Sequence, residues 1–441
     1  MLDSMLTLKL HYIIRINKRT LPCIALSLYL LQEMIYAIFS IAFGGGGTAR
    51  IFTIIVMYLP LIAMLFFQGD KRDVKDFYVL MALIAAFFCV TYLFHPEYYE
   101  WFFEGSYPIK TVIFRPDQCI FAYLFFRVIK DPKDILKTLK ITAYILLLYY
   151  SYQLLHALSV GYWLYNSTGE VEKWSYNLNY GYNHLLVMAI FGYFAMKEKK
   201  LFYWILCGIS VLEIILGGSR GPLVGVGIFG ILLILRFFKE MDMRLRVFLI
   251  VASIFALILF VGIGLETILQ WVSSIIKSLG ISSRTIDMLL QGEIADDNNR
   301  SRIYETAIQM IRNGGLFGYG AYGDRYVIGN IAFVGYCHNI ILEILIDFGI
   351  LLGGIFCLRM FYASIKIMFF AQEKEWGDIY MILFVSVTKL FLSGSFWYSE
   401  AFWGALAVWI SYKKAVKKKK SQMEMKGNEE WTIVQRRSHQ G

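Results

Sequence analysis

Three groups of residues could carry chemistry, and the first is the turn GGSRGP at residues 217–222, which joins two apolar segments. Glycines allow a tight turn that leaves backbone amides free to bind an anion. Arg220 adds a permanent charge and a fork of donors that suits phosphate. The alternative is a simple hairpin whose arginine extends toward the membrane surface. The turn alone does not separate these two interpretations.

The second group is Arg300, Arg302 and Arg312, which lie on or beside a predicted amphipathic helix over residues 301–312. The apolar face of this helix comprises Ile303, Ala307, Ile308 and Ile311. Charges opposite such a face are most often simply solvated. Basic residues are scarce in the other connections on this side of the predicted membrane, so a concentration of arginine indicates an anionic partner.

The third group begins with His338 at the boundary of an apolar segment and continues into that segment with Asn339, Glu343 and Asp347. The last three residues are spaced four apart, so they share one face of a helix. Acidic groups inside a membrane span are costly and usually line a cavity or a site. A histidine beside them can accept or donate a proton near neutral pH. The alternative is an interfacial histidine bonded to lipid or loop, but the neighbouring carboxylates favour a functional role.

Two weaker candidates lie in the first third of the chain. Arg115 and Asp117 interrupt an apolar segment, where the simplest interpretation is that they pair with each other. Glu33 lies alone within the first apolar segment, where a carboxylate needs a polar partner.

The elements that must position these residues are apolar segments of membrane-spanning length. The chain has 441 residues, of which 58% are hydrophobic and only 17% charged, against about 25% charged residues in soluble domains. Runs of roughly 18 or more apolar residues indicate transmembrane helices. Twelve such segments are predicted, near residues 23–43, 51–68, 76–94, 111–129, 138–158, 181–196, 201–217, 221–238, 247–266, 338–360, 378–397 and 399–412. The segment at 111–129 is the weakest.

The distribution of basic residues predicts the orientation of these helices. The formal net charge is +10, which in a soluble protein would suggest nucleic acid, but here Lys and Arg gather in alternate short connections and in the tail. Positive residues remain in the cytoplasm, so both termini are predicted to be cytoplasmic. The predicted regions are N-terminal helices at 1–266, a large extracytoplasmic loop at 267–337, C-terminal helices at 338–412 and a disordered basic tail at 413–441.

Five short motifs, in order and with their spacing, resemble the O-antigen ligase and polymerase superfamily of bacterial membrane enzymes. They are GSRG at 218–221, RIY at 302–304, LFGYG at 316–320, HNIILE at 338–343 and FG at 348–349. The motifs cover about the C-terminal half of the chain, and the N-terminal half agrees with the family only in hydropathy. Members of this superfamily handle glycans linked to undecaprenyl diphosphate.

The resemblance implies an all-α bundle of the GT-C type and a glycosyltransferase that needs no metal and no cofactor. Arg220 and Arg302 would hold the lipid diphosphate, with Arg300 or Arg312 assisting. His338 would activate the acceptor hydroxyl, and Glu343 would orient or tune His338. Arginines can neutralise a diphosphate without a metal. The sequence agrees with this, because the predicted outer side has no Asp-x-Asp motif and its only two adjacent acidic residues are at 296–297, and because its six cysteines lack metal-ligand spacing.

Polymerase and ligase remain open alternatives. A polymerase would join lipid-linked repeat units at the outer face of the bacterial cytoplasmic membrane, with flippase and chain-length regulator proteins as further candidate partners. A ligase would move a finished glycan onto lipid A core or a protein. A lipid or glycan transporter is a rival from another class. It would distribute polar residues through both leaflets and break helices near the midplane, whereas the candidates here gather on one side.

Overall fold

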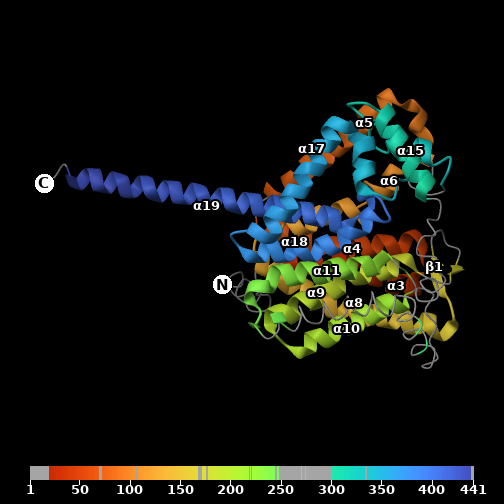
Figure 1. The fold of residues 1–441 in the computed structure, drawn as a ribbon, viewed down its shortest axis with the longest axis horizontal. Coiled ribbons are helices and arrows are strands. Elements are labelled where there is room, and N and C mark those ends of the chain that lie inside the picture. The colour runs from red at the N-terminus through yellow and green to blue at the C-terminus, as the bar shows by residue number, and fades with distance from the viewer. Residues whose placement is uncertain are drawn as a thin grey trace, which may run out of the picture.

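The chain folds into a helical bundle with one short β-hairpin (Figure 1). The computed structural model describes residues 19–68, 72–104, 108–166, 171–174, 177–217, 219, 221–243, 246–247, 270, 274, 300–332 and 335–438. The predicted span at 247–266, except for residue 247, and the acidic pair at 296–297 therefore lie outside the described residues.

Helices make up most of the described chain. The α-helices are α2 (Thr20–Leu30), α3 (Gln32–Phe43), α4 (Gly46–Gln68), α5 (Arg72–Phe94), α6 (Ile109–Val112), α7 (Ala122–Arg127), α8 (Pro132–Val160), α9 (Leu178–Glu198), α10 (Leu201–Leu216), α11 (Gly221–Phe237), α15 (Arg300–Asn313), α16 (Gly323–Ile328), α17 (Ile340–Phe370), α18 (Lys374–Val387) and α19 (Glu400–Ser438). The shorter turns are η1 (Pro96–Tyr98), η2 (Glu100–Glu104), η3 (Cys119–Phe121), η4 (Phe238–Glu240), η6 (Thr388–Phe391) and η7 (Phe396–Tyr398).

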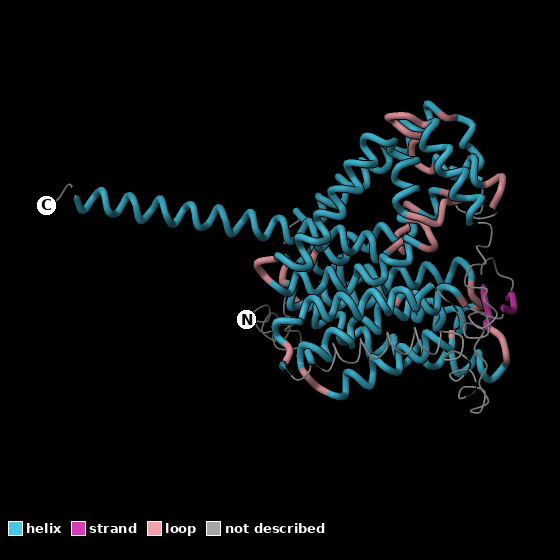
Figure 2. Tube along the Cα trace, viewed as in Figure 1, coloured by secondary structure: helices cyan, strands magenta, loops and turns pink. Residues whose placement is uncertain are grey.

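The two strands form a hairpin that the sequence did not predict. β1 (Trp163–Asn166) and β2 (Val171–Trp174) pair antiparallel, with Trp163 opposite Trp174. Figure 2 shows this hairpin at the end of the bundle opposite to the direction in which α19 extends.

The prediction of an all-α membrane protein is confirmed in its coarse form. Within the described residues, five helices are long and apolar enough to cross a membrane: α4, α5, α8, α11 with its following turn, and α17. The pair α2 and α3 adds a sixth if its two halves, bent by 68°, form one broken span. The count of twelve stays a prediction, because α10, α18 and the segments around 109–127 are shorter than a full span.

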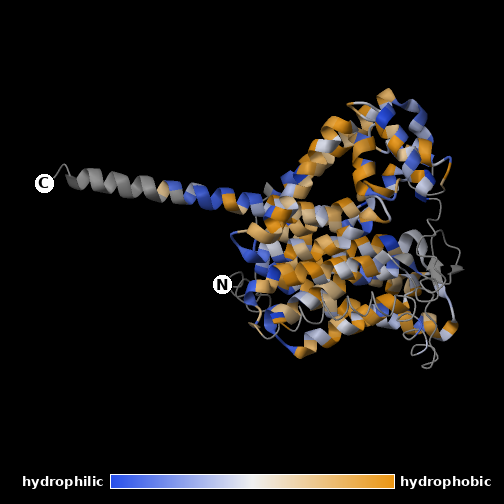
Figure 3. Cartoon of the chain, in the orientation of Figure 1, coloured by the Kyte–Doolittle hydropathy of each residue, from blue (hydrophilic) through white to orange (hydrophobic). Residues whose placement is uncertain are grey.

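α9 is the central helix of the bundle. It packs against α8, α10, α11 and α18, and nearly all of its side chains from Leu185 to Ala195 are buried. Because its apolar residues lie all around the helix, α9 can pack against neighbouring helices on all sides. Figure 3 shows apolar residues along the length of the bundle and hydrophilic residues gathered toward the helix ends.

Ion pairs gather at one end of the bundle, which we call the basic end. They connect the starts of α8 and α18 with the ends of α9 and α11, as Lys133–Glu375, Lys140–Glu198, Arg236–Asp378 and Lys374–Glu240. The alternate basic connections of the sequence thus lie together in space. We call the other end, with the β-hairpin and the start of α9, the hairpin end.

The weak apolar segment at 111–129 is divided into short helices. Its interruption is held by an ion pair in which Arg115 Nε donates to Asp117 Oδ1 at 2.5 Å, and Arg50 also contacts Asp117. The predicted pairing of Arg115 with Asp117 is therefore confirmed. A charged pair costs less than two separate charges in an apolar region, so the helix breaks where the pair forms.

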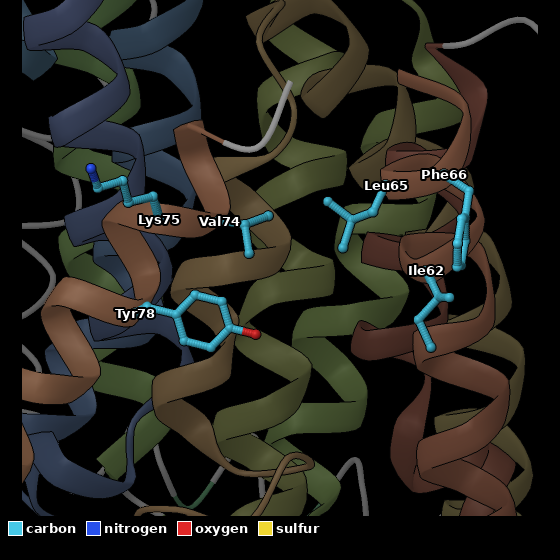
Figure 4. Close-up of a pocket in the computed structure, with 6 residues that line it drawn as sticks. All are labelled: Ile62, Leu65, Phe66, Val74, Lys75 and Tyr78. Atoms are coloured by element: carbon cyan, nitrogen blue, oxygen red, sulfur yellow. The ribbon is translucent and has the colours of Figure 1, made fainter. Parts of the chain in front are cut away.

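A cavity of about 480 Å³ lies where the end of α4 meets the start of α5, and Figure 4 shows its lining. Five of the six lining side chains are apolar or aromatic, and Lys75 is the sixth. The opposite end of α5 reaches the loop that precedes α16, because the Thr91 hydroxyl accepts a hydrogen bond from the Ala321 amide. The cavity is therefore separated from the candidate site by most of the length of α5.

Candidate functional site

A break in α17 fixes the floor of the candidate site. Gly349 adopts φ 74° and ψ 174°, a conformation that only glycine reaches without strain. The break leaves the carbonyls of Ile346 and Asp347 without helical partners. The amides of Tyr319 and Gly320 donate to them at 2.8 and 3.0 Å. The loop that carries the LFGYG motif and the helix segment that carries the FG motif thus meet through backbone hydrogen bonds.

Glycine is required on both sides of this contact because the two backbones nearly touch. A Cβ at Gly349 would overlap the carbonyl oxygen of Leu316, and a Cβ at Gly318 would overlap that of Ile346. The short first half of α17, from Ile340 to the break, is therefore held as a rigid platform.

His338 immediately precedes this platform in a left-handed conformation with φ 54°. Histidine is among the non-glycine residues that tolerate this region. The following Asn339 caps α17, since its Oδ1 accepts from the amides of Ile341 and Leu342 at 3.0 and 3.3 Å. The imidazole lies 4.6 Å from the ring of Tyr336, and its Nδ1 is buried with no hydrogen-bond partner among the described residues.

The surroundings of His338 keep its imidazole neutral. Burial and the positive charge of Arg300 lower the pKa of His338 from 6.5 to about 4, and the negative charge of Asp324 offsets part of this shift. A neutral imidazole can accept a proton at physiological pH. The site therefore presents a free base next to an arginine.

Arg325 is the centre of a buried charge cluster that the sequence reasoning missed. It is 1% exposed and donates to Glu343 Oε1 at 2.8 Å and to Ser395 Oγ at 2.7 Å, and it also pairs with Asp324. Its guanidinium lies 4.4 Å from the centroid of the Tyr322 ring. In the sequence, Asp324 and Arg325 are an adjacent charged pair directly after Gly323, a pattern that is typical of an ordinary polar turn.

The partners of Glu343 differ from those expected. The sequence placed Glu343 as a residue that orients His338, but its carboxylate accepts from Arg325, from Ser395 at 2.5 Å and from the Phe396 amide at 3.1 Å. Asp324 accepts from the Cys337 amide at 3.1 Å. Glu343 therefore reaches the histidine through Arg325, Asp324 and the backbone next to His338.

We expect Arg325→Met to destabilise the protein by roughly 3–5 kcal/mol, because it leaves buried carboxylates without their counter-charge. The measurement is thermal unfolding of the purified protein in detergent. Arg359→Met, which removes an exposed arginine from α17, should change stability by less than about 0.5 kcal/mol. Equal losses in the two variants would show that Arg325 is not the centre of the cluster.

The predicted arginine helix is α15, and it packs directly against the platform. Its buried side chains are Ile303, Ala307 and Met310, which contact Ile328, Cys337 and Ile346. The predicted apolar face was shifted, since Ile308 is 43% exposed and Met310 takes the buried position. Spacing of three, four and seven residues decides which side chains face the core.

The three arginines of α15 occupy different places. Arg300 is half-buried and within electrostatic range of His338, whereas the side chains of Arg302 and Arg312 are exposed. The helical rise separates Arg312 from Arg300 by about 18 Å. The start of α15 therefore brings Arg300 within range of His338, the exposed Arg302 lies in the same turn, and Arg312 lies at the other end of the helix.

Arg220 lies outside the described residues, but the turn that carries it is placed by its neighbours. A Cβ at Gly217 would overlap the ring of Tyr180, and one at Gly221 would overlap the hydroxyl of Tyr182. Both tyrosines belong to the first turns of α9, and Tyr182 is within electrostatic range of Arg300. Gly217 and Gly221 therefore pack at the hairpin end, and Gly221 lies on the tyrosine that is within electrostatic range of Arg300.

The arrangement places fixed positive charge within range of a base. Arg300 carries that charge, and the imidazole of His338 can take a proton from a hydroxyl group. Such a combination suits a transfer reaction in which a phosphate group leaves and a hydroxyl attacks.

Comparison with known proteins gives one family match. Residues 205–357 match a family model described as O-antigen ligase. The matched segment runs from α10 to the middle of α17 and contains all six site residues predicted from the sequence. A comparison with curated proteins finds no match.

Proposed function

We propose that this membrane protein is a polysaccharide polymerase with a GT-C-like architecture. The proposal starts from the match of residues 205–357 to a family model described as O-antigen ligase. It would join repeat units of a glycan carried on undecaprenyl diphosphate, at the extracytoplasmic face of the bacterial cytoplasmic membrane. The observation that carries the proposal is the neutral His338 held beside Arg300, within the segment that matches the family.

The proposed reaction moves one glycan between two lipid carriers. The acceptor hydroxyl attacks the anomeric carbon of the donor glycan, and its proton passes to the imidazole of His338. The bond between the anomeric carbon and the diphosphate oxygen breaks, and the electron pair leaves with undecaprenyl diphosphate. Arg302, with Arg300 assisting, would stabilise the charge that develops on this leaving group.

Arg220 would complete the anion site from the turn at 217–221. The packing of this turn on Tyr182 supports the assignment, because the same tyrosine is within range of Arg300. Glu343 would act as a positioning residue, through Arg325 and Asp324, rather than by contact with the sugar. Arg312 is the least favoured member of the set, because α15 carries it away from His338.

A ligase that transfers the finished glycan onto lipid A core or a protein is the alternative, since both enzymes use the same donor chemistry. A deletion strain separates them. Single repeat units accumulating on the carrier would support the polymerase, whereas long chains remaining on the carrier would support the ligase. Normal surface polysaccharide in that strain would contradict both.

A transporter is less well supported, although broken helices occur in transporters as they do here in α2–α3 and α17. At the break in α17, the carbonyls of Ile346 and Asp347 accept hydrogen bonds from the 315–320 loop, so these two carbonyls are engaged by the protein itself. The charged groups at the basic end are satisfied by ion pairs within the bundle. The residues with chemistry to offer therefore gather at the hairpin end.

The pH dependence of transfer should reflect the lowered pKa of His338. An imidazole with a pKa of about 4 is neutral above that pH, so we expect kcat/KM to stay flat from about pH 8 to pH 5 and to fall only below this range. An ordinary histidine would halve the rate near pH 6.5. The measurement is initial rate against pH with purified protein and extracted lipid-linked glycan.

Arg300→Gln is the control for this profile. Removing the positive charge should raise the pKa of His338 and move the acid limb upward in pH. An acid limb at the same pH in both proteins would contradict the assignment of that limb to His338.

A further inference from the structure

The break between α2 and α3 places polar residues inside an otherwise apolar segment. The two helices meet at Leu31 with a bend of 68°, and Gln32 and Glu33 open the second half. Broken spans with polar residues at the break are characteristic of binding sites in membrane proteins. The proposed transfer reaction does not use Glu33, although the sequence already marked it as unusual.

Three other elements bring polar side chains to this break. Asn183 of α9 donates to Glu33 Oε1 at 3.0 Å, and Gln32 donates to Glu400 Oε1, at the start of α19, at 2.5 Å. From η6, Lys389 donates to Asn179 at 3.1 Å. We call these six side chains the break cluster.

The charges in the break cluster face one another without contact. Lys389 is within electrostatic range of both Glu33 and Glu400, yet no carboxylate oxygen of the described residues lies within 4.0 Å of its Nζ. Glu33 and Asn179 are exposed, and Asn183 and Lys389 are half-buried. Accessible charged groups that face one another without direct pairing are suited to bind a polar ligand between them.

The chemistry of the break cluster fits sugar hydroxyls better than phosphate. The break cluster holds two carboxyl groups and three amides but only one ammonium, so it offers little fixed positive charge for a diphosphate. Hydroxyl groups both donate and accept, so they can bridge carboxylates, amides and an ammonium at once. Lys389 also lies over the ring of Tyr182, 5.1 Å from its centroid, which ties the break cluster to that tyrosine.

The break cluster adjoins the proposed transfer centre through Tyr182. That tyrosine touches the turn next to Arg220 and is within electrostatic range of Arg300. A glycan whose diphosphate lies at the arginines would thus extend past Tyr182 toward Lys389 and Glu33.

We propose that the break cluster binds sugar residues of the lipid-linked glycan, whose hydroxyl groups would donate hydrogen bonds to Glu33, exchange them with Asn183 and accept them from Lys389. This inference rests on the proposed glycan transferase function and adds a glycan subsite to it. The subsite is distinct from the anion site at Arg300 and Arg302, so the two can be separated by experiment.

The test measures binding to purified full-length protein in nanodiscs with three probes. They are the lipid-linked oligosaccharide extracted from a strain lacking this protein, the free oligosaccharide released from it by mild acid, and undecaprenyl diphosphate without sugar. The variants are Glu33→Gln and Lys389→Met. Lys140→Met is the matched control, because it removes a lysine paired with Glu198 at the basic end.

We expect both variants to bind the lipid-linked and the free oligosaccharide at least tenfold more weakly than wild type. Their binding of undecaprenyl diphosphate should stay within twofold, which also verifies that they are folded. Lys140→Met should bind all three probes as wild type does.

Four outcomes would overturn the subsite, three of them in the variants and one in the wild-type protein. The variants could bind the free oligosaccharide normally, they could lose undecaprenyl diphosphate equally, or Lys140→Met could cause the same loss. A wild-type protein that binds undecaprenyl diphosphate but no free oligosaccharide would also exclude it. A wild-type protein that neither binds nor transfers any lipid-linked glycan would instead refute the proposed function itself.

Discussion

His338→Ala should reduce glycan transfer by roughly 10²- to 10⁴-fold, the range that a general base contributes. The side chain is the only titratable group next to Arg300 in the described part of the site that can be neutral at pH 7 and accept a proton. Cells carrying this variant should show single repeat units on a polysaccharide gel in place of long chains. Persistence of long chains at normal abundance would mean that the histidine is not the base.

Two control variants separate chemistry from conformation at this position. Alanine is strained at the φ of 54° that His338 adopts, whereas asparagine tolerates this region and cannot act as a base. We therefore expect His338→Asn to be as inactive as His338→Ala. We also expect His338→Asn to fold and to be present in the membrane at wild-type abundance. His156→Ala, which removes an exposed histidine of α8, should leave transfer unchanged. Activity in His338→Asn would point to a purely structural role.

Gly349→Ala should destabilise the protein strongly, although it adds only one methyl group. Residue 349 has a backbone conformation reserved for glycine, and a Cβ would overlap the Leu316 carbonyl oxygen. Strain and overpacking together should cost more than about 3 kcal/mol. The 315–320 loop would separate from α17, so transfer should be lost as well. Thermal unfolding in detergent and protein abundance in membranes measure the effect.

Gly354→Ala is the matched control, five residues further along the same helix. A Cβ there meets no atom within 4 Å, and alanine favours the helix over glycine by roughly 0.5–1 kcal/mol. This variant should be as stable as wild type or slightly more stable. If Gly349→Ala and Gly354→Ala unfold at the same temperature, the contact between the loop and α17 does not hold the platform.

The sequence by itself determined the class of protein and the local elements of the site. Long apolar segments specify membrane helices because burial in lipid depends on composition over about 20 residues. The spacing of its apolar residues predicted the helix over residues 301–312. The family-like motifs around His338 and their order could be read directly from the sequence. Even here one position was wrong, because Met310 and not Ile308 faces the core. A periodic pattern fixes a face only to within one residue.

Tertiary structure alone decided which of these residues meet. Glu343 pairs with Arg325, 18 residues away, and Ser395, 52 residues away, rather than with His338. The break in α17 is paired by a loop that precedes it in the chain, and the break cluster joins Glu33 to Asn183 and Gln32 to Glu400. Hydropathy and spacing report only on neighbours along the chain. A buried polar group needs a hydrogen-bond partner, and packing between helices that are distant in the sequence decides which residue that partner is.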